Sequence, residues 1–201
     1  MLTDGDGRVV AGATKGELRR AALAARRGMS ASARSAAAEQ LSRTVIARAD
    51  GARLVAAYVP FGTEPGDTGL LDALSARATV IVPVVRGDGD LDWAAWTGAD
   101  DLAPSGPRGR MLRPIGPTLG AAFLAEADLV LVPALLVART GARLGRGGGS
   151  YDRALPRVRP GVPVAALLFD GELVDRLPAD PHDVAVAAAI TPIGGWTDLP
   201  F

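Results

Sequence analysis

Several residue types and patterns are missing from this 201-residue sequence. It has no cysteine, which excludes disulfides, thiolate metal sites and cysteine nucleophiles and suits a reducing compartment. No apolar run reaches the about 18 residues of a membrane-spanning helix, and the first 13 residues do not have the pattern of a secretion signal. Lys and Arg together number 22, as do Asp and Glu, so no net charge attracts nucleic acid or an anionic membrane. We therefore expect a soluble, cytoplasmic protein that binds neither, and we expect a monomer.

Lysine and histidine are also rare, with one residue of each, Lys15 and His182. Arginine supplies the other basic residues, together with abundant Ala, Gly and Pro, as is typical of GC-rich coding sequence. His182 stands among turn residues, with no nucleophile or metal-ligand spacing around it. This favours a structural role for His182 over that of a general base.

Helical and strand-like patterns alternate along the chain. Capping residues and apolar spacing predict helices over residues 14–28, from a cap at Ser30 or Ser32 to Asp50-Gly51, and over 70–77, 121–128 and 151–158. Short apolar runs predict strands over 54–59, 79–85, 129–133, 162–169 and 184–190, with a hairpin at 87–96 and a loop at 98–118. We expect a disordered tail over residues 1–13, then a single α/β domain over 14–201 with a mostly parallel central sheet flanked by helices. Ligands of such sheets bind at the carboxyl ends of the strands.

The most informative motif is GARLGRGGGSYDR, from Gly141 to Arg153, between a predicted strand and a predicted helix. Successive glycines let backbone N–H groups converge on an anion, because no side chain blocks the approach and positive φ angles cost little. Arg143 and Arg146 add positive charge, the following helix adds its positive end, and Asp152 is an oxygen ligand of the kind that Mg²⁺ uses. The motif is not a Walker A loop, since it lacks the Gly-Lys-Ser/Thr end. A triphosphate site and a flexible surface loop both fit this segment.

Two further groups of residues suit ligand binding. Lys15 and Arg19 share one face of the first predicted helix, where two cations suit a phosphate clamp, although a solvated basic face is the commoner reason for such a pair. Glu64 follows the first predicted strand, where its carboxylate could pair with N–H groups of a heterocycle that lies on Phe61. The alternative for Glu64 is a polar turn before a helix.

Together these segments resemble the 5-formyltetrahydrofolate cyclo-ligase family, also called 5,10-methenyltetrahydrofolate synthetases. The family's first helix carries Lys-x-x-x-Arg, matched by Lys15 and Arg19, and a Glu follows its first strand, as in AYVPFGTE. Its motif Gly-x-Arg-Leu-Gly-x-Gly-x-Gly-Tyr-Tyr-Asp-Arg matches residues 141–153, and its Leu-Pro…His-Asp-Val segment matches LPADPHDV. The similarity covers roughly residues 14–192 and implies a fold similar to that of sugar-phosphate isomerases and coenzyme A transferases.

The resemblance implies an enzyme that uses ATP as co-substrate and Mg²⁺ as cofactor. ATP phosphorylates the formyl oxygen of 5-formyltetrahydrofolate, the second ring-forming nitrogen attacks, and phosphate leaves to give 5,10-methenyltetrahydrofolate and ADP. The implied catalytic residues are Lys15 and Arg143, and Asp152 is the implied metal ligand. The implied ATP-binding residues are Lys15, Arg19, Arg143, Gly145, Arg146, Gly147, Gly148, Gly149, Ser150 and Tyr151. The implied folate-binding residues are Val59, Phe61, Glu64, Arg146, Gly147, Gly148, Gly149 and Ser150.

The sequence departs from the family pattern in four places. Ser150 replaces the first of two tyrosines, and Gly66 replaces an acidic residue after Glu64. Ala187 stands where the family carries a further Asp, and the Gly-x-x-Phe-Asp before the glycine motif is replaced at Ala134, Val137 and Ala138. These changes leave the phosphate-binding residues in place and bear on folate specificity and on the metal.

Two alternative functions remain open at this point. The first is a divergent relative that binds a nucleotide or a folate-like ligand without turning it over, which Ser150 and Ala187 favour. The second is an enzyme of the same broad fold that acts on a different phosphate ester. Retention of Lys15, Arg19, Arg143 and Asp152 together favours ATP chemistry over the second alternative.

Overall fold

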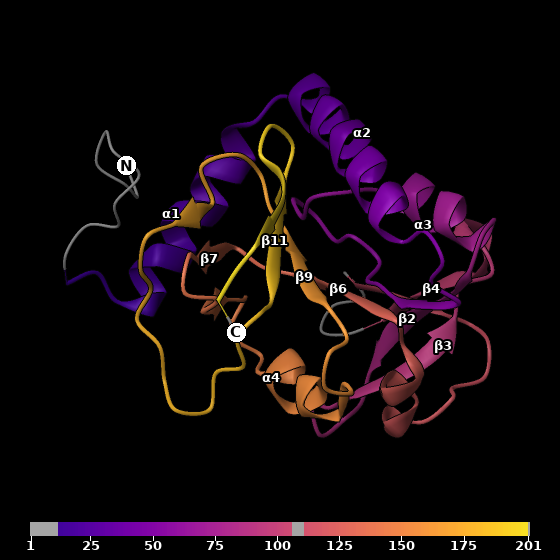
Figure 1. The fold of residues 1–201 in the computed structure, drawn as a ribbon. Coiled ribbons are helices and arrows are strands. Elements are labelled where there is room, and N and C mark those ends of the chain that lie inside the picture. Colours follow the sequence, from indigo (N-terminus) through magenta and orange to yellow (C-terminus); the bar gives the residue numbers. More distant parts are fainter. Residues whose placement is uncertain (1–11, 106–110, 201) are drawn as a thin grey trace.

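The protein is built around a seven-stranded sheet, seen in a computed structural model that describes residues 12–105 and 111–200 (Figure 1). The strand order is β12-β11-β9-β6-β1-β2-β3. The five inner strands are parallel, and the two outer strands, β12 and β3, are antiparallel to their neighbours. The bounds are β1 (Leu54–Ala56), β2 (Thr79–Val85), β3 (Leu91–Ala95), β6 (Leu129–Pro133), β9 (Val164–Leu167), β11 (Ala188–Thr191) and β12 (Gly195–Asp198). The mostly parallel sheet confirms the predicted α/β architecture, while nearly all of the predicted tail, residues 1–13, lies outside the described residues.

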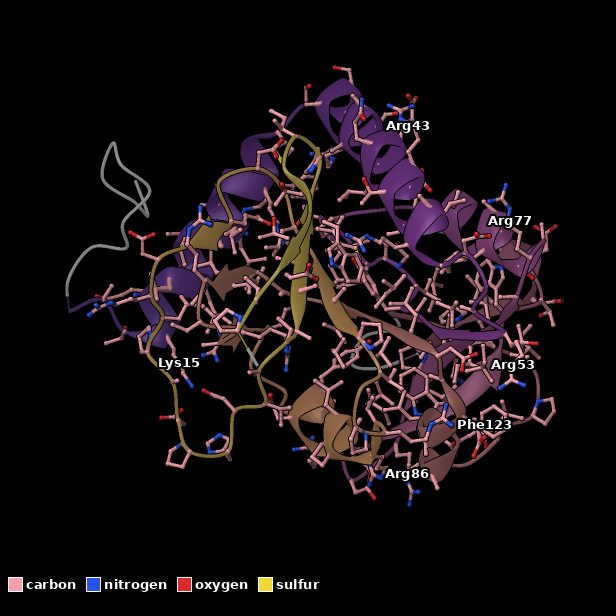
Figure 2. All side chains as sticks on the ribbon, in the orientation of Figure 1. Lys15, Arg43, Arg53, Arg77, Arg86 and Phe123 are labelled. Carbon is pink, nitrogen blue, oxygen red and sulfur yellow. The ribbon has the colours of Figure 1, made fainter. Side chains whose placement is uncertain are left out.

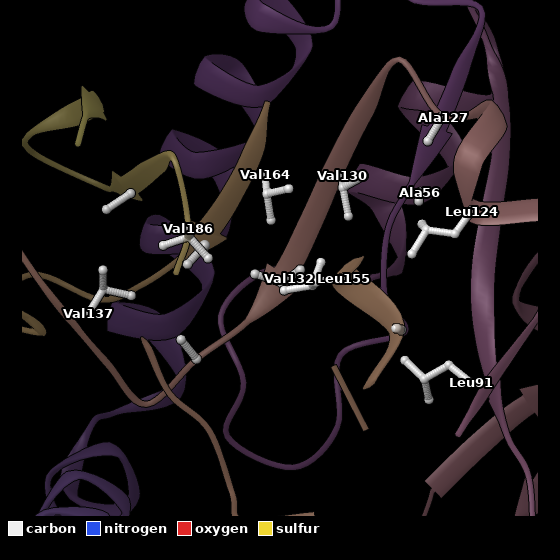
Figure 3. Packing of buried hydrophobic residues seen from close by; sticks show 14 of the residues in the cluster. Ala56, Leu91, Leu124, Ala127, Val130, Val132, Val137, Leu155, Val164 and Val186 are labelled. Atoms are coloured by element: carbon white, nitrogen blue, oxygen red, sulfur yellow. The ribbon is translucent and has the colours of Figure 1, made fainter. Parts of the chain in front are cut away.

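Alternate residues of each inner strand pack on opposite faces of the sheet. In β2, for example, Val80 and Val82 belong to one hydrophobic cluster and Ile81 to the other. Helices α2 (Ala31–Arg48) and α3 (Thr68–Ser75) cover the first face. The other face is covered by η3 (Ala121–Glu126), α4 (Ser150–Ala154) and η4 (Leu155–Arg157), as Figures 1 and 3 show. This burial on both faces explains why the strands read as continuous apolar runs.

Helix α1 (Lys15–Gly28) packs instead on a small sheet made of β7 (Leu136–Ala138), β8 (Arg143–Leu144) and β10 (Leu173–Val174). Its buried residues Leu18 and Ala22 form a third cluster with residues of that sheet, including Leu136 and Leu144. The predicted capping box is present, because Thr14 and Glu17 each accept a hydrogen bond from the other's backbone N–H. The start of α1 is thereby fixed beside the strand that leads into the glycine motif.

The prediction of a loop over residues 98–118 is wrong. This stretch contains η1 (Ala99–Asp101) and a two-stranded ribbon of β4 (Leu102–Ser105) and β5 (Met111–Pro114). Its prolines and glycines favoured a loop in the sequence. Pro104 and Pro114 are nevertheless tolerated, since both strands of a two-stranded ribbon are edge strands, whose outward N–H groups need no partner.

Other elements differ from prediction in extent or type. Residues 121–126 form a 3₁₀ helix in place of an α-helix, and the helix predicted over 151–158 is five residues of α-helix followed by a 3₁₀ turn. Strands β1, β9 and β11 are shorter than the apolar runs that contain them. Ser30, rather than Ser32, caps α2. No helix within the described residues has the length and apolar character needed to cross a membrane.

Candidate active site

A cavity of about 370 Å³ lies where β1, β2 and β6 end. Its walls come from the residues that follow these strands, from one face of α1, from the glycine motif and from the β4–β5 ribbon. Every site residue predicted from the sequence lines it: Lys15, Arg19, Val59, Phe61, Glu64, Arg143, Gly145, Arg146, Gly147, Gly148, Gly149, Ser150, Tyr151 and Asp152. The fold therefore brings together three segments that lie far apart in the sequence, although the role of each residue stays a prediction.

The loop over residues 145–149 needs glycine for two physical reasons. Gly147 and Gly149 have φ angles of +101° and +66°, in the left-handed region that other residues rarely adopt. A side chain at Gly147 would also press against Arg19, whose guanidinium carbon lies 3.4 Å from the position of the added Cβ. Arg19 Nε donates a hydrogen bond of 2.9 Å to the carbonyl of Gly145, so α1 and the glycine loop hold each other.

The positive end of the following helix contributes less than predicted, because α4 has only five residues. The side chains of Arg19, Arg143 and Arg146 and the backbone N–H groups are therefore the groups at the loop that can attract an anion.

Arg143 and Tyr151 place two unused donors in the cavity wall. The Nη2 of Arg143 donates to Asp152 Oδ1 at 2.8 Å, whereas its Nε is buried and has no partner among the described residues. The hydroxyl of Tyr151 is likewise buried without a partner in the described chain. Burial raises the pKa of Tyr151, which keeps its hydroxyl protonated as a donor. Buried polar groups are normally paired, so both donors fit a site that receives an acceptor-rich ligand.

Lys15 reaches from α1 to the acidic segment that follows β10 (Figure 2). Its Nζ lies 2.7 Å from Asp180 Oδ2 and 2.5 Å from Asp183 Oδ2. Partial burial alone would lower the pKa of Lys15, but the two carboxylates outweigh it, so the pKa is raised and the side chain stays charged. His182 lies between these two acids in sequence, and its side chain is 77% exposed. It does not line the cavity, and its exposure leaves the structural role predicted from the sequence without support, so the role of His182 stays a prediction.

Arg146 lines the cavity and reaches from the glycine loop to the segment after β1. Its Nε donates to Glu64 Oε1 at 2.9 Å, and its guanidinium lies 5.3 Å from the centre of the Phe61 ring. The backbone N–H of Phe61 holds the second carboxylate oxygen, Oε2, at 2.9 Å. The two residues predicted to hold a heterocycle therefore lie together, and they face the cavity as a pair.

Several lining residues were not predicted. Tyr58 is buried and donates to the carbonyl of Pro65, which shapes the loop after β1. Leu112 and Arg113 of β5 line the wall that the sequence suggested was a loop. Further unpredicted lining residues are Arg26, Pro83, Val85, Leu91, Ser105, Pro133, Ala134, Leu135, Leu144 and Asp183. Pro83, Val85 and Leu91 could have been predicted, because they belong to β2 and β3 and strand ends border the ligand side of the sheet.

Arg26 anchors the far end of α1 through a buried ion pair. Its Nε and Nη2 donate to the two carboxylate oxygens of Glu172, each at 2.7 Å, and Nη2 also donates to the carbonyl of Ala134 at 2.6 Å. The backbone N–H of Phe169 donates to the same carboxylate at 2.8 Å. This pair fixes α1 against the strands whose ends border the cavity.

Asp152 has the chemistry of a magnesium ligand. It lines the cavity, and Arg143 and the backbone N–H of Val184 both donate to Oδ1. Its second oxygen, Oδ2, has no hydrogen-bond partner among the residues described. Mg²⁺ usually takes one or two carboxylates together with substrate phosphates and water, so one free carboxylate oxygen beside a phosphate-binding loop fits this ion.

Comparison with known proteins gives consistent results. The model of the 5-formyltetrahydrofolate cyclo-ligase family matches residues 11–192. A 5-formyltetrahydrofolate cyclo-ligase of Mycolicibacterium smegmatis is 42% identical over 193 residues, which cover 92% of this chain and 97% of that protein. A protein of the same name from Escherichia coli is 35% identical over 78 residues, 36% of this chain and 41% of its own length.

Solved structures agree in fold. The 5,10-methenyltetrahydrofolate synthetase of Aquifex aeolicus has a TM-score of 0.69 at 26% identity, with 89% of each chain covered. A 5,10-methenyltetrahydrofolate synthetase of Mycoplasma pneumoniae gives a TM-score of 0.69 at 20% identity, with 88% of this chain and 98% of that chain covered, which supports the fold alone. The family match spans most of the chain, and Lys15, Arg19, Glu64 and most of the glycine motif, which carry much of the resemblance, line one cavity. This chain belongs to the 5-formyltetrahydrofolate cyclo-ligase family.

Proposed function

We propose that this protein converts 5-formyltetrahydrofolate to 5,10-methenyltetrahydrofolate with hydrolysis of ATP to ADP and phosphate. The observation that carries the proposal is that one cavity joins the cationic glycine loop to the Glu64–Phe61 pair. The first suits a polyphosphate and the second suits a planar ring that bears N–H groups. Family membership supports the same reaction.

Lys15, Arg19 and the backbone of residues 145–151 would hold the triphosphate. Lys15 already lies beside two carboxylates, which keep it charged and fix its position on the cavity side of α1. Arg143 would stabilise the negative charge of the transferred phosphoryl group, since its Nε is a buried donor without a partner in the described chain. Lys15 and Arg143 are thus the proposed catalytic residues.

Asp152 would hold Mg²⁺ through its free oxygen. The ion would neutralise charge on the phosphates when bound. Arg143 holds the other oxygen of Asp152, so the arginine orients the carboxylate as well as facing the phosphates. Ala187, which replaces an Asp of the family pattern, does not line the cavity; Asp183 does, but Lys15 and the backbone N–H of Asp180 already donate to its Oδ2. We therefore expect one carboxylate, Asp152, to supply the main protein contact to the ion.

The folate ring would lie against Phe61 and Val59 with its N–H groups at Glu64. The formyl oxygen then attacks the γ-phosphorus of ATP, and ADP leaves. The second nitrogen adds to the activated formyl carbon and loses its proton, and the C–O bond breaks to release phosphate and leave the methenyl bridge. An amide oxygen is a poor leaving group until it is phosphorylated, so the cavity has to align the two substrates and neutralise charge.

The test is direct, because the methenyl product absorbs near-ultraviolet light that 5-formyltetrahydrofolate does not. Purified protein with ATP, Mg²⁺ and 5-formyltetrahydrofolate should develop this absorbance, and omission of either ATP or Mg²⁺ should abolish it. Absence of the signal with nucleotide binding still seen by calorimetry would favour the non-catalytic relative suggested by Ser150 and Ala187.

We also propose that the enzyme is cytoplasmic and monomeric. The absence of cysteine suits a reducing compartment, and all the predicted site residues line the cavity of a single chain. Sedimentation of the active enzyme at assay concentration should give the mass of one chain, and cell fractionation should recover the activity with the soluble proteins.

A further inference from the structure

The contact between Arg146 and the Glu64–Phe61 pair is unusual because it joins two groups that the proposed reaction assigns to different substrates. Arg146 belongs to the glycine loop, next to the glycines that would hold the triphosphate. Its Nε donates to Glu64 Oε1 at 2.9 Å, its Nη2 donates to the carbonyl of Phe61 at 3.2 Å, and its guanidinium carbon lies over the Phe61 ring, 5.3 Å from the ring centre. One planar cation thus uses both the carboxylate and the aromatic face.

The guanidinium resembles one edge of the folate ring in shape and chemistry. The pyrimidine half of that ring carries an amino group and a ring N–H on the same carbon, so it presents a planar N–C–N edge with donors, as a guanidinium does. In the guanidinium, Nε meets Glu64 Oε1 and Nη2 meets the carbonyl of Phe61, and the two donors of the folate edge can meet the same two acceptors while the plane lies over the aromatic ring. Arg146 and the folate ring would therefore compete for Glu64 and Phe61.

Arg146 is well placed to leave this position. Its side chain is 38% exposed, whereas that of Glu64 is 11% exposed, so the arginine is the more accessible partner. Pairs of this kind are weak, and double-mutant cycles give them a factor of about five in an equilibrium constant at most. A triphosphate in the neighbouring loop offers a charge of about −4 within reach of the same residue, against the single charge of Glu64.

We propose that Arg146 is an internal occupant of the folate-ring subsite and that ATP releases it. ATP binding then frees Glu64 and Phe61 and raises the affinity for 5-formyltetrahydrofolate, and by linkage the folate raises the affinity for ATP by the same factor. The inference rests on the proposed function, because it takes Glu64 and Phe61 as the ring-binding residues. It goes beyond that function because it gives Arg146 a role in coupling the binding of ATP to the binding of 5-formyltetrahydrofolate.

Calorimetry on the full chain tests the proposal with a non-hydrolysable ATP analogue. In the wild type, the Kd of 5-formyltetrahydrofolate should fall about fivefold when the analogue is present. In Arg146→Met, which keeps an apolar stem but removes the guanidinium, the Kd without nucleotide should already be about fivefold lower, and the analogue should change it little. Arg43→Met is the matched control, since Arg43 is an exposed arginine on α2 outside the cavity lining, and it should behave as the wild type (Figure 2).

The outcomes separate this inference from the proposed function. A wild type that binds 5-formyltetrahydrofolate equally well with and without the analogue overturns the inference alone, as does weaker folate binding by Arg146→Met without nucleotide. A wild type that binds no 5-formyltetrahydrofolate in either state overturns the proposed function, and the inference with it. Circular dichroism of Arg146→Met should match the wild type, because the residue is on the surface of a loop.

Discussion

The two ends of α1 hold their cations in opposite ways. Near its C-terminal end, Arg26 is 1% exposed, lies between both oxygens of Glu172 and the carbonyl of Ala134, and is part of the packed interior. At its N-terminal end, Lys15 pairs with Asp180, which is largely exposed, and with Asp183 on a segment without regular structure. The first arrangement fixes the helix, whereas the second offers a cation to the cavity.

This difference shows which ion pairs a ligand can replace. A buried pair cannot lose one partner without leaving a charge in a low-dielectric interior, so it acts as a permanent anchor. Lys15 keeps 18% of its side chain exposed, and one of its two partners, Asp180, is 54% exposed, so phosphate oxygens can replace that contact without leaving a charge unpaired in the interior. The helix therefore combines a rigid attachment at one end with an exchangeable charge at the other.

The largest expected effect comes from breaking the anchor. Glu172→Gln removes the charge that balances Arg26 and should lower the free energy of unfolding by about 3–5 kcal/mol in urea titrations. The double variant Arg26→Met/Glu172→Met, which removes both charges, should recover much of this loss. A loss below about 1 kcal/mol for Glu172→Gln would mean that the pair does not hold the helix.

The next largest effect concerns Lys15, at the N-terminal end of α1. Lys15→Ala should raise the KM for ATP at least about tenfold, equivalent to about 1.4 kcal/mol, with a much smaller change in the KM for 5-formyltetrahydrofolate. Arg20→Ala is the control, because Arg20 is on the same helix but does not line the cavity. Equal changes in the two KM values would contradict a phosphate-binding role for Lys15.

A smaller effect is expected at the cap that starts the helix. Thr14→Ala removes the side-chain acceptor of the capping box and should cost about 1 kcal/mol of stability in thermal or urea unfolding. Ser30→Ala removes the cap of α2 and should cost a similar amount. Only Thr14→Ala should also raise the KM for ATP, because Lys15 is the first residue of the capped helix; a rise in both variants would argue against this local effect.

The smallest effect is the pH dependence of the Lys15–Asp183 pair. Partial burial alone would raise the pKa of Asp183, but the N–H of Asp180 and the charge of Lys15 outweigh it and hold the pKa below its usual value. A carboxylate with a lowered pKa stabilises the folded state above its unfolded pKa of about 3.9, and this contribution is lost as the pH falls through the folded value. The stability difference between His182→Gln and His182→Gln/Asp183→Asn, a background without the imidazole that lies 4.0 Å from Asp183, should therefore be small and constant from pH 5 to 7 and shrink below about pH 4. A difference that grows on acidification would contradict the lowered pKa.

The sequence predicted the elements whose signals are local. Thr14 and Glu17 marked the start of α1, and the apolar runs marked the inner strands, because burial on both faces leaves few polar positions. The glycine motif could also be recognised from the local sequence, since Gly147 and Gly149 adopt backbone angles that favour glycine.

Contacts between distant segments were not predictable in this way. Arg26 and Glu172 are 146 positions apart, and Lys15 and Asp183 are 168 apart, so no spacing rule connects them. Arg26 is also one of many arginines, and nothing in its neighbourhood distinguishes it from the exposed ones. The β4–β5 ribbon was missed because its prolines suppress the strand signal in a place where an edge strand tolerates them.

The single lysine of the chain makes the cavity chemically addressable. Lys15 carries the only side-chain amine among the 201 residues, so an acylating reagent has one side-chain target besides the α-amino group. Its raised pKa makes the neutral, reactive amine scarce at neutral pH, and acylation should therefore accelerate as the pH rises. Because Lys15 lines the cavity, protection of this one amine by ATP would report nucleotide occupancy by mass spectrometry, without any engineered label.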